Sequence, residues 1–371
     1  MPFRLAETPL FVPHELRDFL ESATRDVIAQ LSHPDTIARM RAAIPPRYDC
    51  PGMDALPSCA QVDFAVVRGS SGAFEGRVIE LQGFPSLYAF LPIQFAAWAS
   101  VLRTMPGLDL PYSMWLGGHD ETSALDVLRR TLLAGLEPSD VVLVDIDPSH
   151  QKTLCDFIAT HKLFGIDTVC ITEIVREGRR LFRRKDGRLV PIRRIYFRTV
   201  FDELERKEIQ TPFSFRDDLD VTFCPHPNWY WVWSKYSLPF LSHPAVPAAR
   251  FLSDPGELID DLASCVLKPL FSFAGTGVRV DVQREHVEAI PVEERSQWLL
   301  QRKVDYSRSL LMPDGSGVAA EIRVMCLRPS DFAEVRPMYM LVRLSRGSMI
   351  GVDQNRDMPW TGSSAGVWTA G

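Results

Sequence analysis

Hydrophobic side chains recur at helical spacing near the start of the chain. Leu16, Phe19 and Leu20 form an apolar stripe that follows Pro13, and an acidic residue lies in the first turn. This pattern predicts a helix beginning near residue 13. A second helix is predicted over residues 34–43, and the prolines that follow it indicate an irregular link.

Alternation of apolar and polar side chains replaces helical spacing over residues 61–67 and 76–82. A segment rich in glycine and serine separates these two runs, so we expect an antiparallel hairpin. Glu80 and Gln82 are two positions apart and therefore point to one face of their strand. Asp63 on the partner strand can share that face. Two carboxylates and an amide oxygen suit a hard cation such as Mg²⁺, and a solvent-facing polar stripe is the equally weighted alternative.

In the middle of the chain, predicted helices alternate with apolar strands. An apolar helix at about 90–103 and an amphipathic helix over 123–134 lead into the apolar strand at 140–147. A helix over 149–162 and a buried strand over 165–171 follow, and this succession predicts a βαβ unit with a parallel sheet. We interpret the two acids that end the first strand, at positions 145 and 147, as strand-end caps.

The second half of the chain is predicted to be rich in strands. A charged hairpin over 179–190 and a strand over 195–200 precede an aromatic segment at 228–235, which we interpret as core packing in preference to a pocket wall. Further strands are expected in the ranges 296–305, 317–327 and 337–346. The end of the chain, from 351 to 364, is expected to be loop-like.

One stretch, residues 265–282, combines a lysine with a small flexible turn. β-branched residues alternate on both sides of the turn, which predicts a hairpin. A loop of small residues lets backbone N–H groups approach a phosphate, and Lys268 adds a charge for the same oxygens. The P-loop and the dinucleotide-binding glycine motif are both absent. An ordinary surface hairpin with a solvated lysine is the alternative.

Composition narrows the class of protein. The chain has 371 residues, 46% of them hydrophobic and 24% charged, with a net charge of −6. These values fit a globular protein of two or three domains and give no support to a nucleic-acid partner. We expect no signal peptide and no membrane association. Seven scattered cysteines favour a cytoplasmic location over a disulfide framework, and no ligand spacing for zinc occurs.

Several motifs together resemble a known fold. The Lys268-Pro269 pair, its small loop and the following Gly277-Val278 resemble the lysine strand and flexible loop of the ATP-grasp superfamily. Gln61-Val-Asp63 with Glu80-Leu-Gln82, and later Ser234-Lys235, are similar to motifs of its circularly permuted branch, which includes the synthetase domain of glutathionylspermidine synthetase. The metal-ligand segment precedes the lysine strand, as in that branch, and the resemblance runs from about residue 63 to residue 364.

The resemblance implies an α/β (α+β) architecture: a permuted ATP-grasp fold with a flavodoxin-like, pre-ATP-grasp βαβ domain. The implied segments are 1–115, with the N-terminal helices and the metal-ligand hairpin, 116–225, with the βαβ domain, and 226–371, with the lysine strand, glycine loop, adenine hinge and C-terminal strands. Relatives of this fold are frequently dimers, so a homodimer is an expectation.

The resemblance also implies site residues and a reaction. ATP and Mg²⁺ are the expected cofactors, and the expected activity is ADP-forming ligation of a small-molecule carboxylate to an amine through an acyl phosphate. Arg198, Arg323 and Arg343 are candidate catalytic residues, and for Arg323 and Arg343 a strand-edge salt bridge is the alternative. The full expected set comprises catalytic Lys268, Arg323, Arg343 and Arg198; nucleotide-binding Lys235, Lys268, Ser272, Gly275, Thr276, Gly277, Gln301, Lys303 and Val304; and metal-binding Asp63, Glu80 and Gln82.

The sequence departs from the family pattern at two of these motifs. Gln61 stands where the family has an arginine, and Gln82 stands where it has an asparagine. Two alternatives therefore stay open: an MgATP-binding protein without ligase activity, acting as a scaffold or regulator, and a small-molecule kinase.

Overall fold

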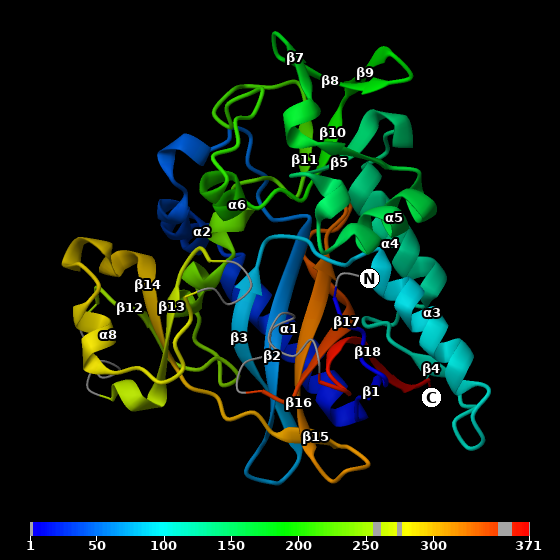
Figure 1. The fold of residues 1–371 in the computed structure, drawn as a ribbon, viewed down its shortest axis with the longest axis vertical. Coiled ribbons are helices and arrows are strands. Elements are labelled where there is room, and N and C mark those ends of the chain that lie inside the picture. The colour runs from blue at the N-terminus through cyan, green and yellow to red at the C-terminus, as the bar shows by residue number, and fades with distance from the viewer. Residues whose placement is uncertain (1–2, 255–260, 273–276, 348–357, 371) are drawn as a thin grey trace.

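A computed structural model describes residues 3–254, 261–272, 277–347 and 358–370. Its largest element is a mixed sheet that runs through the centre of the molecule (Figure 1). The strands in spatial order are β1 (Leu10–Phe11), β18 (Gly362–Thr369), β17 (Arg336–Ser345), β16 (Gly317–Leu327), β2 (Cys59–Arg68) and β3 (Phe74–Gln82), with β15 (Arg308–Leu311) on β16 and β4 (Tyr112–Ser113) on β18. The predicted hairpin of β2 and β3 is confirmed, since the two strands pair antiparallel.

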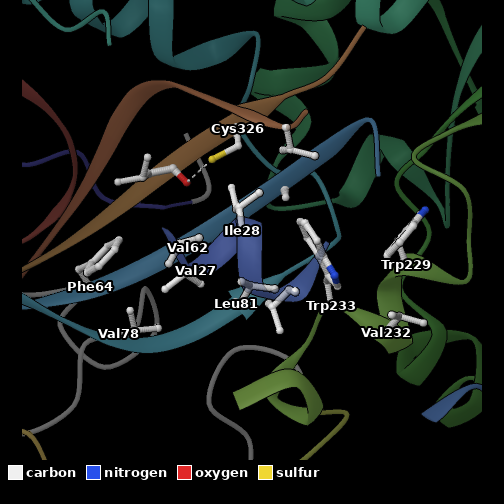
Figure 2. Close-up of a cluster of buried hydrophobic side chains, with 14 of the residues drawn as sticks. Val27, Ile28, Val62, Phe64, Val78, Leu81, Trp229, Val232, Trp233 and Cys326 are labelled. Carbon is white, nitrogen blue, oxygen red and sulfur yellow. Dashed lines mark hydrogen bonds between the residues drawn. The ribbon is translucent and has the colours of Figure 1, made fainter. Parts of the chain in front are cut away.

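The two faces of this sheet are covered by different helices. Helix α1 (His14–Leu31) packs on one face, where Val27 and Ile28 meet Val62 and Leu81 (Figure 2). Helices α3 (Phe90–Leu102) and α4 (Glu121–Leu133) lie on the opposite side, near β18 and β16. Because side chains alternate along a strand, Asp63 points away from α1.

A second sheet is entirely parallel. Its order is β11 (Thr222–Cys224), β10 (Arg194–Phe197), β5 (Val141–Asp145) and β6 (Asp167–Cys170). Helix α5 (Leu154–Phe164) connects β5 to β6, so the predicted βαβ unit is confirmed. The helix begins later than expected because Pro148–His150 forms a separate 3₁₀ turn.

Smaller elements complete the fold. An antiparallel sheet of β12 (Ala249–Phe251), β14 (Trp298–Arg302) and β13 (Cys265–Pro269) stands beside the main sheet, with α8 (Arg284–Glu288) on its outer side (Figure 1). The remaining strands, β7 (Val175–Glu177), β8 (Arg180–Lys185) and β9 (Arg188–Ile192), include the predicted charged hairpin. The remaining α-helices are α2 (Pro34–Met40), α6 (Phe201–Arg206) and α7 (Trp229–Val232).

Two expectations about strands were wrong. Beyond the turn after β13, Arg279 makes only a single bridge to Leu267, so β13 takes β14 as its regular partner and the 278–282 strand does not form. The end of the chain contains β18, although part of it was expected to be a loop. Small residues fill this strand, and it is stabilised by pairing with β17 and β1 more than by its own propensity.

The segment boundaries at 115 and 225 stay a prediction. The main sheet takes β2 and β3 from the first of the expected segments and β16, β17 and β18 from the third. Among the described residues, no helix combines the length and apolar character needed to cross a membrane.

Candidate active-site cleft

A large cavity lies where the main sheet and the parallel sheet meet. Its volume is about 600 Å³, which is in the range of small-molecule sites. The main sheet, the parallel sheet and the segment from Tyr230 to Lys235 all contribute to its wall. Cationic side chains outnumber acidic ones there; the charged lining residues are Lys152, Arg198, Arg206, Lys207, Lys235, Arg323 and Arg343, with Glu80, Asp145, Asp202, Glu203 and Glu321.

Lys235 and Glu80 meet at this cavity. The Lys235 Nζ atom lies 3.3 Å from the Glu80 Oε1 atom, and the same Nζ donates a hydrogen bond of 2.7 Å to the carbonyl oxygen of Ser272. Lys235 begins a 3₁₀ helix, Lys235–Phe240, whose first turn is capped by the Ser234 side chain. The expected lysine, acid and loop serine are thus brought together from three distant parts of the sequence.

Gly83 allows this close approach. It directly follows β3 and Gln82, and its N–H donates to the carbonyl oxygen of Trp233. A Cβ atom at position 83 would overlap the backbone of Trp229, so a larger residue would push β3 away from α7. Trp229 and Trp233 are fully buried, as the core-packing interpretation predicted, and Trp233 also lines the cavity.

Lys268 is not among the residues that line the cavity, but it bonds to β3 next to Glu80, which does line it. Its Nζ atom donates to the carbonyl oxygen of Ile79 at 2.9 Å and to the Gln301 Oε1 atom at 2.7 Å. Burial lowers the pKa of Lys268 to about 8; the nearby Glu80 carboxylate opposes this effect, and the Lys235 charge adds to it. Gln301, expected near the adenine, also donates to the Val78 carbonyl at 3.2 Å, so it joins β14 to β3.

A buried ion network occupies the face of the main sheet below the cavity. Asp63 is opposite Glu80 on one side and Arg323 on the other. Both Asp63 oxygens accept hydrogen bonds from Arg323 at 2.6 Å, and Arg343 adds another bond of 2.6 Å. Burial by itself raises the pKa of Asp63, but the two guanidinium groups hold it below its ordinary value.

The same network continues to the neighbouring strands. Arg343 also pairs with Glu321, and the Tyr306 hydroxyl donates to Glu321 at 3.1 Å. Glu321 and Tyr306 were not singled out as a pair from the sequence, because Tyr306 lies between β14 and β15 and meets Glu321 on β16 only in the folded chain. The buried Gln61 donates from Nε2 to the Ser86 carbonyl at 3.0 Å, so it acts on the loop after β3 and makes no bond to this network.

Arg198 contributes to the cavity wall from the end of β10 in the parallel sheet. Its guanidinium pairs with Asp156 at 2.5 Å and donates to Thr153 at 3.2 Å. Both members of the ion pair are buried. Arg198 follows β10, and its ion pair with Asp156 on α5 joins these two elements of the parallel unit. Arg198 also lines the cavity.

The remaining expected residues divide into three groups. Ser272 and Gln82 line the cavity. Gly277, Lys303 and Val304 do not line it; Lys303 bonds from its backbone to Ser264 and pairs with Asp281. Gly275 and Thr276 lie outside the described residues.

The oxygen groups on β3 fit a hard cation better than Asp63 does. Glu80 lines the cavity with 27% of its side chain exposed, and Gln82 lies two positions further along the same face. The Asp63 oxygens already have guanidinium partners. No group of three or more His, Cys, Asp or Glu side chains suited to a metal occurs in the part of the chain that the structure describes.

Sequence reasoning assigned no chemistry to Asp145, which ends β5 and lines the cavity. Its Oδ1 atom accepts the N–H of Ile146 at 2.7 Å, so the expected capping role is confirmed. Burial raises the pKa of Asp145 to about 7. The available signal was its position at the carboxyl end of a parallel strand, where α/β sheets commonly bind ligands.

Comparison with known proteins shows a likeness to solved structures and none to known sequences. No sequence-family model matches the chain, and no curated protein matches it. Among solved structures, a glutathione synthetase-like effector from Globodera pallida, in its apo form, superposes with a TM-score of 0.60 at 11% sequence identity. The match covers 92% of this chain and 87% of the other. The chain therefore has a mixed α/β fold of the glutathione synthetase-like, ATP-grasp type.

Proposed function

We propose that this protein is an ATP-dependent carboxylate–amine ligase that forms an amide bond through an acyl phosphate and releases ADP and phosphate. One observation carries the proposal: Glu80 and Lys235 meet at the cavity, and Lys268 bonds to the backbone of Ile79 beside them. A triphosphate needs cationic side chains and oxygen ligands for Mg²⁺ in one place. The ATP-grasp type of fold supports the same conclusion.

The proposed roles follow from position. Lys235 and Lys268 hold the nucleotide phosphates, and Ser272, whose carbonyl oxygen accepts from Lys235, lies beside them. Glu80 and Gln82 hold Mg²⁺, which neutralises phosphate charge when bound. Arg323 and Arg343 line the cavity beside them and stabilise the acyl phosphate. Asp63 positions these two arginines through its hydrogen bonds, so it is a positioning residue in this proposal.

The reaction has two steps. A carboxylate oxygen of the first substrate forms a bond to the γ-phosphorus atom while the bond from that phosphorus to the bridging oxygen of ADP breaks. The amine nitrogen then forms a bond to the acyl carbon, and phosphate leaves with the electron pair of the broken C–O bond. Enclosure by the cavity protects the acyl phosphate from water. The order of β3 before β13 supports a place in the permuted branch that includes the synthetase domain of glutathionylspermidine synthetase.

The test combines product analysis with matched variants. The protein is incubated with ATP, Mg²⁺ and a panel of carboxylic acids and amines, and the expected products are ADP, phosphate and an amide. Lys235→Ala should reduce turnover at least about 100-fold, because it removes a charge that balances developing phosphate charge. Lys162→Ala, on the exposed side of α5, is the control and should retain activity. Formation of AMP and pyrophosphate would contradict the proposal.

A second candidate is a protein that binds MgATP without ligase activity. The full occupation of the Asp63 oxygens by two arginines favours it, since an expected metal ligand is unavailable in this arrangement. Calorimetric binding of MgATP without ADP formation from any substrate would support this candidate. A phosphorylated product identified by mass spectrometry would instead indicate a kinase.

A further inference from the structure

Asp145 combines deep burial with access to the cavity. Only 3% of the residue is exposed, yet it lines the cavity wall. Its Oδ1 atom accepts the Ile146 N–H, whereas Oδ2 makes no hydrogen bond with the rest of the described chain. An unpartnered carboxylate oxygen at a cavity is available to a bound molecule.

The surroundings of Asp145 hold its carboxyl group in place. Arg198 lies near it and is itself fixed by Asp156. Glu203 and Lys207 from the α6 region are further charged neighbours, and they pair with each other at 2.6 Å. Cys170 is opposite Asp145 on β6. Because Arg198 and Lys207 already have acidic partners, they do not cancel the capacity of Asp145 to bind a cation.

This region is continuous with the proposed phosphate region. The Arg198 guanidinium carbon lies 5.8 Å from the centre of the Phe84 ring, and Phe84 is two residues beyond Gln82. Phe84 and Arg198 both line the cavity. A small substrate at Asp145 therefore shares one enclosed space with groups held at Glu80 and Lys235.

We propose that the cavity wall at the carboxyl ends of β5 and β10 is the binding site for the amine substrate and that Asp145 accepts its proton. This inference rests on the proposed ligase function. The amine enters as an ammonium group and gives one proton to the Asp145 carboxylate. The nitrogen lone pair then forms the C–N bond as the C–O bond to phosphate breaks. The departing phosphate takes the second nitrogen proton and leaves as HPO₄²⁻, and Asp145 returns its proton to water.

Two properties suit Asp145 to this role. Its carboxylate can pair with an ammonium group in a site of low polarity, where such a pair is strong. A general base works best when its pKa is close to the working pH, and burial brings the pKa of Asp145 to about 7. An amine nucleophile that arrives uncharged would need no such base.

The experiment uses hydroxylamine as that uncharged nucleophile. Hydroxylamine is neutral at pH 7 and captures acyl phosphates as hydroxamates. Wild-type protein, Asp145→Asn and the exposed control Asp147→Asn are given ATP, Mg²⁺ and acetate, succinate or glutamate. The nucleophile is hydroxylamine in one series and glycine, ethanolamine or putrescine in the other. Thermal unfolding verifies that both variants are folded.

We expect Asp145→Asn to form hydroxamate within about twofold of wild type but to lose about 100-fold or more in amide formation at pH 7. The amide rate of this variant should recover as the pH rises, because more of the amine is then uncharged. Asp147→Asn should match wild type in both series.

Each other outcome has a distinct meaning. If wild-type protein forms neither ADP nor hydroxamate with any acid, the proposed ligase function fails, and the amine site fails with it. If wild type forms hydroxamate but Asp145→Asn still forms amide normally, only the role of Asp145 is overturned. Equal losses in both series would mean that Asp145 acts before the amine step, which also overturns the inference. Hydroxamate formation without amide from any amine would overturn the amine site.

Discussion

Lys268 donates a hydrogen bond of 2.9 Å to the carbonyl oxygen of Ile79, although 189 positions separate the two residues along the chain. The bond joins the small antiparallel sheet to the edge strand of the main sheet. It places the lysine directly beside Glu80, one of the acids that line the cavity. The lysine strand and the acidic strand therefore converge as the sequence motifs predicted.

Burial of Lys268 should make stability depend on alkaline pH. Below pH 8 the lysine is charged in the folded and the unfolded chain, so the cost of burying the charge is fully present. Between about pH 8 and 10.5 only the unfolded chain keeps the proton, so this group makes the free energy of unfolding rise with pH. Compared with Lys268→Met, the free energy of unfolding of the wild type should rise by nearly 3 kcal/mol over this range, because a shift of one pKa unit corresponds to about 1.4 kcal/mol.

Urea unfolding of both proteins at several pH values between 7 and 10 measures this effect. Lys162→Met, which alters an exposed lysine, should follow wild type. A pH profile for Lys268→Met that is parallel to wild type would show that Lys268 is not buried as a charge.

Removing the Asp63 carboxylate should destabilise the fold strongly. Asp63→Asn leaves the buried Arg323 without its counter-ion and removes one of the two acidic partners of Arg343; breaking such a buried pair typically costs about 3–5 kcal/mol. Because the pKa of Asp63 is lowered in the folded state, this stabilisation is present at neutral pH and is lost as the pH falls below about 4.

Urea unfolding at pH 7 and at about pH 2 checks both statements, because the loss occurs only below the unfolded pKa of about 4. The control is Asp314→Asn, which removes an exposed acid paired with Arg346 at 3.4 Å and should cost less than about 1 kcal/mol. A similar small cost for Asp63→Asn would contradict the network.

Ionisation of Asp145 should destabilise the folded chain, whereas ionisation of Asp63 stabilises it. Its pKa is raised in the folded state, so the folded chain binds the proton more tightly, and the free energy of unfolding falls as the pH rises from about 4 to 7. Asp145→Asn removes this fall, because the amide does not ionise. Above pH 7 the variant should therefore be more stable than wild type, by up to roughly 4 kcal/mol.

Thermal or urea unfolding at pH 5 and pH 8 tests this expectation without any substrate. Asp147→Asn serves again as the control, since Asp147 is exposed and pairs with His150. The explanation fails if the difference between wild type and Asp145→Asn is the same at both pH values.

Glu80→Gln should weaken the response to magnesium. The substitution keeps the shape of the side chain but removes a charged oxygen ligand and the partner of Lys235. We expect the Mg²⁺ concentration required for half-maximal ADP formation to rise about tenfold or more.

Titration of Mg²⁺ at fixed ATP measures that concentration. Glu75→Gln on the same strand is the matched control, because Glu75 pairs with Arg77 and does not line the cavity. An unchanged magnesium requirement in Glu80→Gln would remove Glu80 from the proposed metal site.

Local patterns in the sequence determined most of the elements. The stripe around Leu16 and Leu20 predicted α1, and the alternation around Val62 predicted the β2–β3 hairpin. Apolar runs separated by a helix predicted the parallel βαβ unit. These features depend on neighbours within a few residues, because burial of one helix face or one strand face is already visible in the order of residue types.

The tertiary structure alone decided which side chains meet. No local pattern shows that both Asp63 oxygens bind arginines, since Arg323 reaches Asp63 only through the pairing of β16 with β2. The strand β18 is stabilised by the strands that pair with it, and Asp145 has a raised pKa because of burial by distant segments. Sheet register and burial arise from contacts between residues far apart in the chain, and a single sequence leaves these contacts open.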